Sequence, residues 1–222
     1  MPRISTAFAR PWTLRTPAVT RYLEKEFVDE FFKDGKLRIP SFKKLRENPD
    51  EQRGDPMEGR ISMRITTPNS NHSVAAINGQ EAYILCAGTV EQLAMAETFN
   101  TKHGIRITNS LAFADSISRH IPGFLGGIEG LCSYREDLGI LKYDSNAISP
   151  PDSYPDPEKW SNDYERYVAH HAEENFFIKH LKFSHQGEYR FVWFASGQER
   201  DFIDVVCPQA IQFCQRLYIR GS

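Results

Sequence analysis

The chain has 222 residues, a length that suits one large domain. Hydrophobic residues make up 40% and charged residues 25%, which is ordinary for a globular protein, and no apolar run reaches the 18 residues or so of a membrane span. The formal net charge of −2 and the pI of about 6.4 exclude a chain that binds polyanions over its whole surface, but not one with a local basic face.

The N-terminus has no apolar core of signal-peptide length, and no two of the four cysteines form a Cys-x-x-Cys pair. We therefore expect a cytoplasmic protein with reduced thiols, no structural zinc site and no membrane association. Residues 1–17 hold three prolines without apolar periodicity, and we interpret them as an arm on the surface.

Apolar spacing and turn residues predict short strands and helices in the first third of the chain. The predicted elements are a strand at 18–23, a helix at 24–33, a strand at 36–41, one or two helical turns at 41–47 and a strand at 60–67. Gly35 suits the position just past a helix end. The polar segment 50–59 is interpreted either as a solvated loop or as a functional loop beside a pocket.

The dipeptide Asn78-Gly79 is a strong turn signal and predicts a hairpin between strands at 73–77 and 81–87. The second of these strands, which contains Tyr83, is apolar throughout and should be central in a sheet. The next predicted elements are a helix at 90–99, a strand at 104–108, a helix from Asn109 or Ser110 to His120, and strands at 128–134 and 138–143.

Four prolines at 144–159 predict an irregular, mobile loop or lid, which we do not treat as a domain boundary. The later elements are helix-like spacing at 160–182, a turn at 186–188, strands at 189–193 and 201–206, and a helix that Pro208 opens. Short strands with helices early and late indicate an α+β sandwich, in one domain over 1–222.

The turn at Gln186-Gly187-Glu188 is the stretch with the clearest chemistry. On an extended segment, side chains at i and i+2 point the same way, so one amide and one carboxylate could face one substrate. The chain has no glycine-rich phosphate loop and no Gly-x-Ser-x-Gly elbow, so nucleotide-binding folds of the common types and serine hydrolases lack their main support.

Gln-x-Glu at the start of a late strand resembles the catalytic turn of ADP-ribosyltransferases, whose toxins carry Glu-x-Glu or Gln-x-Glu there. The resemblance implies a mixed β-sandwich with flanking helices and NAD as a substrate. Glu188 would then be the catalytic carboxylate, and Gln186 would orient the acceptor. Arg21 matches the family's early arginine, which grips the pyrophosphate. Ser41 stands where such toxins often carry Ser-Thr-Ser, of which this chain has one residue.

With Arg21 and Ser41 we place Arg53 and Tyr83 among the residues that bind NAD. The segments FFKDGKLRIPSF, Gly54-Asp55-Pro56-Met57-Glu58 and Lys179-His180 resemble a widespread group of bacterial proteins linked to abortive phage defence. That resemblance spans roughly residues 20–195. The chain is also similar to ADP-ribosyltransferases that modify mRNA in toxin–antitoxin systems. This similarity implies a toxin with a nucleic-acid acceptor, RNA rather than DNA, and a possible antitoxin partner.

Three alternatives stay open at this point. The chain could be a non-catalytic interaction module, in which the turn and the acidic loop are solvated surface, or a protein-directed ADP-ribosyltransferase. Histidines 170, 171, 180 and 185 with Glu174 could instead bind a metal, since His171 and Glu174 share a helix face. If Arg21 and Glu188 lie on adjacent strands that line one cleft, the transferase hypothesis is favoured.

Overall fold

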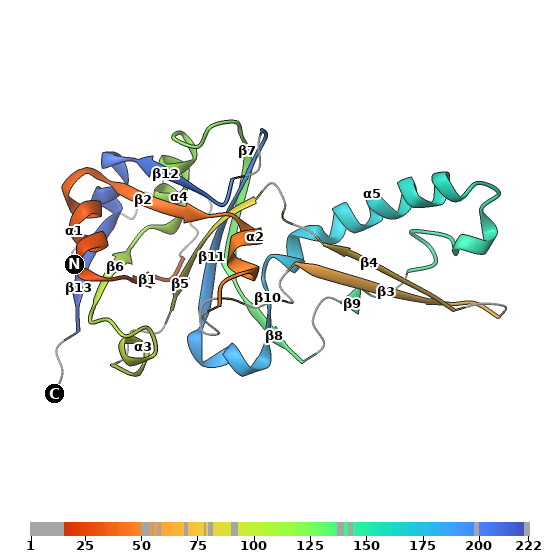
Figure 1. The fold of residues 1–222 in the computed structure, drawn as a ribbon, viewed down its shortest axis with the longest axis horizontal. Coiled ribbons are helices and arrows are strands. Elements are labelled where there is room, and N and C mark those ends of the chain that lie inside the picture. The colour runs from red at the N-terminus through yellow and green to blue at the C-terminus, as the bar shows by residue number, and fades with distance from the viewer. Residues whose placement is uncertain are drawn as a thin grey trace, which may run out of the picture.

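The computed structural model describes residues 16–49, 54, 56, 59–68, 71–77, 79, 82–89, 93–136, 140–141, 144–197 and 200–219. Arg53 and nearly all of the predicted arm lie outside these residues. The fold combines a large antiparallel sheet with several helices, which confirms the predicted α+β class (Figure 1). Among the helices so described, none has both the length and the apolar composition needed to cross a membrane.

The main sheet has six antiparallel strands in the order β13-β6-β1-β5-β11-β7. They are β1 (Val19–Tyr22), β5 (Ala82–Gly88), β6 (His103–Ile107), β7 (Phe124–Leu131), β11 (Glu188–Ala195) and β13 (Cys214–Tyr218). The place of β5 between β1 and β11 confirms the prediction of a central strand, because its side chains are buried on both faces.

The two faces of β11 differ in chemistry. Tyr189, Phe191 and Trp193 point into the main core, where they meet Tyr83 and Leu85 of β5. The alternate residues of β11 point to the other face, where they begin with a carboxylate and a guanidinium and continue with apolar side chains. The two-residue period of the strand thus separates the core from the face that carries charge.

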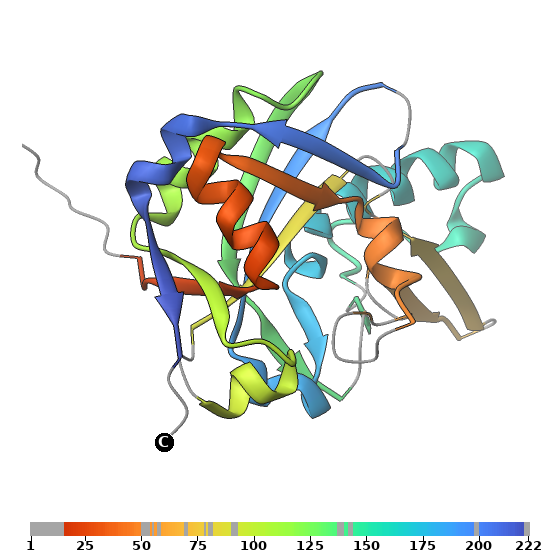
Figure 2. The same ribbon diagram turned by 60° about the vertical axis from the view of Figure 1, so that its left-hand side comes forward.

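A second layer covers the core face. It consists of α1 (Lys25–Asp34), α4 (Ser110–Ser118), the 3₁₀ helix η3 (Pro208–Phe213) and an antiparallel pair of β2 (Lys36–Pro40) and β12 (Phe202–Val206). Figure 2 shows α1, β2 and β12 crossing in front of the central strands. Apolar residues from each of these elements join the main core, which therefore lies between the two layers.

The other face of the main sheet is covered by smaller elements. These are α2 (Phe42–Arg46), α3 (Leu93–Thr98), a parallel pair of β8 (Ser133–Arg135) and β10 (Ile178–His180), and the 3₁₀ helix η2 (Leu181–Gln186). Phe42 and Leu45 of α2 pack with Phe176 against Ile84 and Val192 of the sheet.

A further sheet and helix extend to the right of this body in Figure 1. They are β3 (Arg60–Thr66), β4 (Asn71–Ile77), β9 (Ile140–Leu141) and α5 (Pro157–Asn175), with the short 3₁₀ helix η1 (Pro151–Ser153). Met63 and Ile65 of β3 pack against Tyr164 and Tyr167 of α5 in a small core of their own.

The predicted hairpin across Asn78-Gly79 is wrong. β4 pairs with β3, whereas β5 pairs with β1 and β11 in the main sheet. A strand that is apolar on both sides gains most where both of its faces are buried, and that burial outweighs the local turn preference. Gly79 still needs to be glycine, because its φ is +90° and a Cβ there would meet the Phe42 ring at 2.7 Å.

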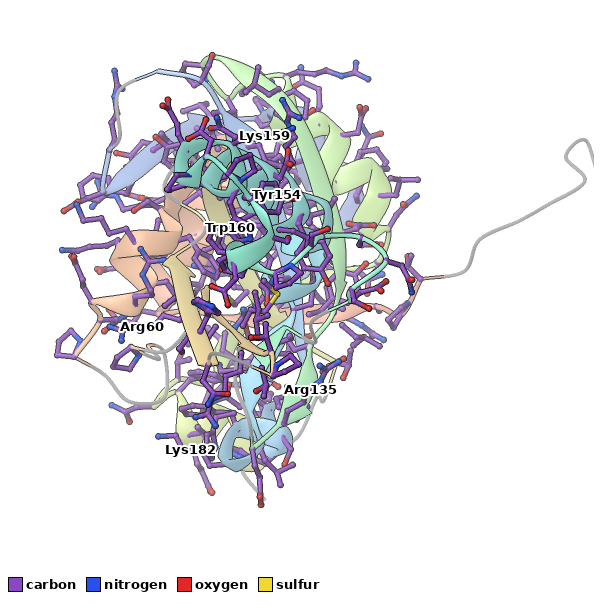
Figure 3. The ribbon with its side chains drawn as sticks, turned by 90° about the vertical axis from the view of Figure 1, so that its right-hand side faces the viewer. Arg60, Arg135, Tyr154, Lys159, Trp160 and Lys182 are labelled. Atoms are coloured by element: carbon purple, nitrogen blue, oxygen red, sulfur yellow. The ribbon has the colours of Figure 1, made fainter. Side chains whose placement is uncertain are left out.

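The boundary between irregular and helical structure near residue 159 is also corrected. The helix α5 begins at Pro157, since a proline fits the first turn, and it ends at Asn175 rather than near 182. The segment before it contains η1 and folds back onto the helix: the Tyr154 hydroxyl donates to Asp163, and Trp160 Nε1 donates to the Ser149 carbonyl (Figure 3).

The predicted last helix is wrong as well. Pro208 opens the short 3₁₀ helix η3, and the residues that follow form β13, which pairs with β6. An apolar residue at every third position fits both an α-helix and a 3₁₀ turn. Here the 3₁₀ turn ends early, because the following residues pair with the edge of β6. The strand expected at 128–134 divides into β7 and β8, and that expected at 138–143 is described only as β9.

We predict that Gly35→Ala lowers the free energy of unfolding by about 1–3 kcal/mol, because Gly35 ends α1 with φ +78° and its Cβ would lie 2.2 Å from the Cys207 carbonyl oxygen. Urea unfolding measures this. Gly126→Ala is the matched control, since a Cβ there meets nothing within 4 Å. Equal stabilities of the two variants would contradict the prediction.

Candidate functional site

A cavity of about 200 Å³ opens on the charged face of the main sheet. Its walls come from β1, β5, the start of β11 and the neighbouring β10, with Leu45 of α2 and Phe99 after α3 along its sides. Arg21, Lys179, Gln186 and Glu188 all line it. This cavity is the candidate site, because it is where charged and amide side chains from distant parts of the chain converge.

Glu188 is the first residue of β11, as the sequence predicted, and its side chain is only 6% exposed. Lys179 Nζ donates to one carboxylate oxygen, and Arg190 Nε donates to the other. Burial by itself raises the pKa of the Glu188 carboxyl, but the charges of Arg190 and Lys179 outweigh burial and lower it. Glu188 is therefore an ionised carboxylate that two cations share.

The surroundings of this carboxylate are held by backbone contacts. The Glu188 N–H donates to the Tyr134 hydroxyl at 2.6 Å, and Arg190 Nη1 donates to the Phe176 carbonyl at 2.7 Å. Burial raises the pKa of Tyr134 to about 12, so this phenol stays protonated at neutral pH. The backbone of Glu188 is thus tied to β8, and Arg190 is tied to the residue that follows α5.

Lys179 joins the carboxylate to the amide. Its ammonium donates to Gln186 Oε1 at 2.9 Å as well as to Glu188, and it lies 4.6 Å from the centre of the Phe183 ring. Both Lys179 and Gln186 are buried. A buried amide whose oxygen accepts from an ammonium has a fixed orientation, so its NH₂ group points in a defined direction.

The prediction that Gln186 and Glu188 point the same way from one extended segment is wrong. Gln186 ends η2, and Gly187 adopts the left-handed conformation with φ 51° and ψ 46°. The Gly187 carbonyl accepts from the backbone N–H of Thr89 at 2.9 Å. Gln186 and Glu188 converge on the cavity because Lys179 contacts both, not because they share one face of a strand.

Arg21 lies on β1, as predicted, and reaches the same cavity. Its Nη1 donates to the Cys86 carbonyl of β5 at 2.9 Å. Because β5 separates β1 from β11, Arg21 and Glu188 are on walls of one cavity but not on adjacent strands. Of the two conditions that favour the transferase hypothesis, the shared cavity is therefore met and the adjacency of the two strands is not.

The structure does not bring Ser41 and Tyr83 to this cavity. The Ser41 hydroxyl accepts from the Lys44 N–H and caps α2, and Ser41 forms a bridge with Tyr83. Tyr83 points into the main core, on the face of β5 opposite to Glu188.

Two residues of the site were not among those chosen from the sequence. Arg190 had a signal, since it follows Glu188 by two positions on a predicted strand and must share its face. For Lys179 the only signal in the sequence was the Lys179-His180 dipeptide. Tertiary contacts, and not local spacing, bring β10 to η2 and β11.

A second cavity of about 420 Å³ adjoins the first and shares Arg21, Leu23 and Pro40 with it. Two aromatic side chains stand on it half-exposed, Phe27 at 48% and Phe202 at 43%. The Arg38 guanidinium lies 4.3 Å from the centre of the Phe202 ring and bonds Asp204 through Nε at 2.8 Å and Nη2 at 3.0 Å. Arg21 stands where the two cavities meet.

The side chains of His170, His171 and Glu174 lie outside the described part of the structure. Within that part, no group of three or more His, Cys, Asp or Glu side chains could hold a metal ion. Comparisons of the chain with protein-family models, curated proteins and solved structures find no match.

We predict that Glu188→Gln lowers the free energy of unfolding by about 3–5 kcal/mol, because two buried cations lose the negative charge they share. Thermal or urea unfolding measures this. Glu165→Gln on the exposed side of α5 is the control, with an expected change below about 0.5 kcal/mol. Adding Lys179→Met to Glu188→Gln should recover part of the loss, and no recovery would contradict the shared-charge description.

The same cluster predicts a pH dependence. The pKa of Glu188 is lower in the folded state than in the unfolded state, so the unfolded chain binds this proton first as pH falls. The stabilisation is complete above the ordinary carboxyl pKa of about 4.3 and is lost progressively below it. Between about pH 5 and about pH 3 the wild type should therefore lose more unfolding free energy than Glu188→Gln. Parallel slopes would show that Glu188 is not the titrating group.

Proposed function

We propose that the chain is an NAD-dependent ADP-ribosyltransferase whose reaction centre is the Glu188 cavity. The acceptor proposed with it is a nucleic acid, RNA rather than DNA, and the setting is phage defence, both taken from the resemblance of the sequence. One observation supports the proposal: Arg21, Gln186 and Glu188, chosen from opposite ends of the chain, line one cavity.

The chemistry requires breaking the bond between the ribose C1′ and the nicotinamide nitrogen. Nicotinamide leaves with the bonding electron pair, an oxocarbenium-like ribosyl cation develops, and an acceptor atom bonds C1′ as its proton is lost. An ionised carboxylate stabilises such a cation and accepts a hydrogen bond from a ribose hydroxyl. Because Lys179 and Arg190 reduce the negative potential around Glu188, this stabilisation depends on direct contact between Glu188 and the ribose.

The two cavities together give a dinucleotide the room it needs. A volume of about 200 Å³ is below the range of about 300–1,000 Å³ that is usual for ligand sites, and the adjoining cavity adds about 420 Å³. Arg21 at their junction suits a pyrophosphate between two nucleoside halves, since a guanidinium grips phosphate through two parallel bonds. The exposed rings of Phe27 and Phe202 offer stacking surfaces to a base.

Burial favours a second candidate, a non-catalytic interaction module. A carboxylate that is 6% exposed and bonded to two cations also suits a purely structural ion pair, which would hold β10 and η2 against β11. In that case the cavity would bind no NAD. A protein-directed transferase is the third outcome that the acceptor assay distinguishes.

The deciding experiment incubates the purified protein with NAD labelled in its adenosine part and with separate pools of RNA, DNA and protein. Label on RNA supports the proposal, and label on protein alone would replace the proposed acceptor. If no pool is labelled and no nicotinamide is released, the non-catalytic alternative stands.

We predict that Arg21→Lys weakens NAD binding about tenfold or more, because a point charge replaces a two-bonded guanidinium and loses the contact with the Cys86 carbonyl. Isothermal titration calorimetry measures the affinity. Arg216→Lys, exposed on β13 and paired with Asp29, is the control and should bind NAD as the wild type does. Unchanged affinity in Arg21→Lys would move the phosphate contact elsewhere.

We predict that Gln186→Ala retains slow hydrolysis of NAD to water and loses transfer to the acceptor, because an amide adds no charge to the ribosyl cation but can hold an acceptor group. Nicotinamide release and incorporation of label are followed in parallel, for wild type and variant. Loss of both activities in a variant that still unfolds cooperatively would mean that Gln186 acts in bond cleavage.

A further inference from the structure

The peptide bond between Gly187 and Glu188 is held at both of its polar atoms. Its carbonyl oxygen, on Gly187, accepts from the Thr89 backbone N–H at 2.9 Å and from the Thr89 hydroxyl at 3.0 Å. Its N–H, on Glu188, donates to the Tyr134 hydroxyl at 2.6 Å. The carbonyl and the N–H of a trans peptide point in opposite directions, so these contacts hold one planar unit from two sides.

In the contact with Glu188, the Tyr134 hydroxyl takes the place of a backbone carbonyl of the sheet. In an antiparallel pair, opposed residues exchange both of their N–H···O bonds at every second position. Tyr189 lies opposite Leu131, the last residue of β7, so Glu188 lies opposite Cys132. The Cys132 N–H donates to the Glu188 carbonyl at 2.9 Å, but the Glu188 N–H donates to the phenol. A side chain thus completes the start of β11.

The pair of β8 and β10 holds Glu188 at its backbone and at its carboxylate. Tyr134 of β8 lies opposite Lys179 of β10, and residues opposed in register direct their side chains to the same face. Tyr134 contacts the Glu188 N–H, and Lys179 contacts the carboxylate. The two contacts differ in kind, because an ammonium is a point charge that can follow a carboxylate, whereas a peptide N–H bonds well only along one direction.

Gly187 makes the contacts at the peptide bond necessary. It has φ 51° and ψ 46°, and glycine, which lacks a Cβ, opposes rotation of the following peptide plane less than any other residue. The contacts of Thr89 and Tyr134, and not local steric limits, therefore fix the plane from which Glu188 enters the cavity.

We propose that Tyr134 is a positioning residue of the reaction: its hydroxyl, acting with Thr89, fixes the peptide bond before Glu188 so that the carboxylate meets the ribose. This inference rests on the proposed function, which makes Glu188 the reacting carboxylate. Tyr134 is not among the residues that line the cavity, so its hydroxyl acts through Glu188 and not on NAD. A displaced carboxylate loses more contact with the transition state than with bound NAD, because positive charge develops only as the bond breaks.

Steady-state kinetics of nicotinamide release from NAD test the proposal. Tyr134→Phe removes only the hydroxyl, and it should lower kcat about tenfold to a hundredfold while KM for NAD changes less than about threefold. Thr89→Val should lower kcat less, by about threefold, because the backbone N–H still donates to Gly187. Tyr154→Phe, whose hydroxyl donates to Asp163 on α5, is the matched control and should leave both constants unchanged.

Hydrogen exchange of the Glu188 amide tests the contact in the absence of NAD. This amide should exchange about tenfold or more faster in Tyr134→Phe than in the wild type, because its acceptor is removed. The Val192 amide in the middle of β11 should keep its rate, which shows that the variant is folded. A Glu188 amide that exchanges without protection in the wild type would overturn the proposal without any variant.

The kinetic outcomes separate this inference from the activity on which it rests. A wild type that releases no nicotinamide would refute the proposed function, and the role of Tyr134 in the reaction with it. An active wild type with unchanged kcat in Tyr134→Phe, despite faster exchange of the Glu188 amide, would overturn the positioning role alone. A rise in KM at constant kcat would also overturn it, because Tyr134 would then act in the binding of NAD.

Discussion

The ion cluster of Lys179, Glu188 and Arg190 is the interaction on which the charged face of this protein depends. Taking three charged groups out of water costs several kcal/mol for each, and that cost is offset only where geometry and further hydrogen bonds are good. Here the Gln186 amide oxygen accepts from Lys179 and the Phe176 carbonyl accepts from Arg190, while the Tyr134 hydroxyl accepts from the backbone N–H of Glu188. The cluster consequently fixes β8, β10, η2 and β11 relative to one another, and the cavity takes its shape from that arrangement.

The cluster also limits what the cavity can do. A carboxylate surrounded by water could accept hydrogen bonds from many kinds of donor. Glu188 already accepts from two cations, and little of its side chain is exposed to solvent. A ligand must therefore bring a hydroxyl close to it to be recognised, and Arg21, which lines the same cavity, favours a ligand that is also anionic. Structural and functional roles of the cluster are not exclusive, because a site held rigidly needs little reorganisation when a ligand binds.

Several local features could be read from the chain because neighbouring residues determine them. The apolar run at Tyr83 required a central strand, Gly35 ended α1 in the left-handed conformation, and Asn109 capped α4 through its side chain. The position of Glu188 at the start of β11 followed from the aromatic alternation after it. Arg190 could have been added by the same two-residue period.

The sequence by itself determined which segments are strands or helices over much of the chain and which residues carry charge at the Gln186-Gly187-Glu188 turn. Only the tertiary structure decided that β4 and β5 separate into different sheets, that Lys179 reaches Glu188, and that β7 becomes an edge. Local conformation depends on neighbours within a few residues, whereas strand pairing depends on which of many competing segments buries the most apolar surface. That competition involves the whole chain at once, so spacing within a short stretch does not predict its outcome.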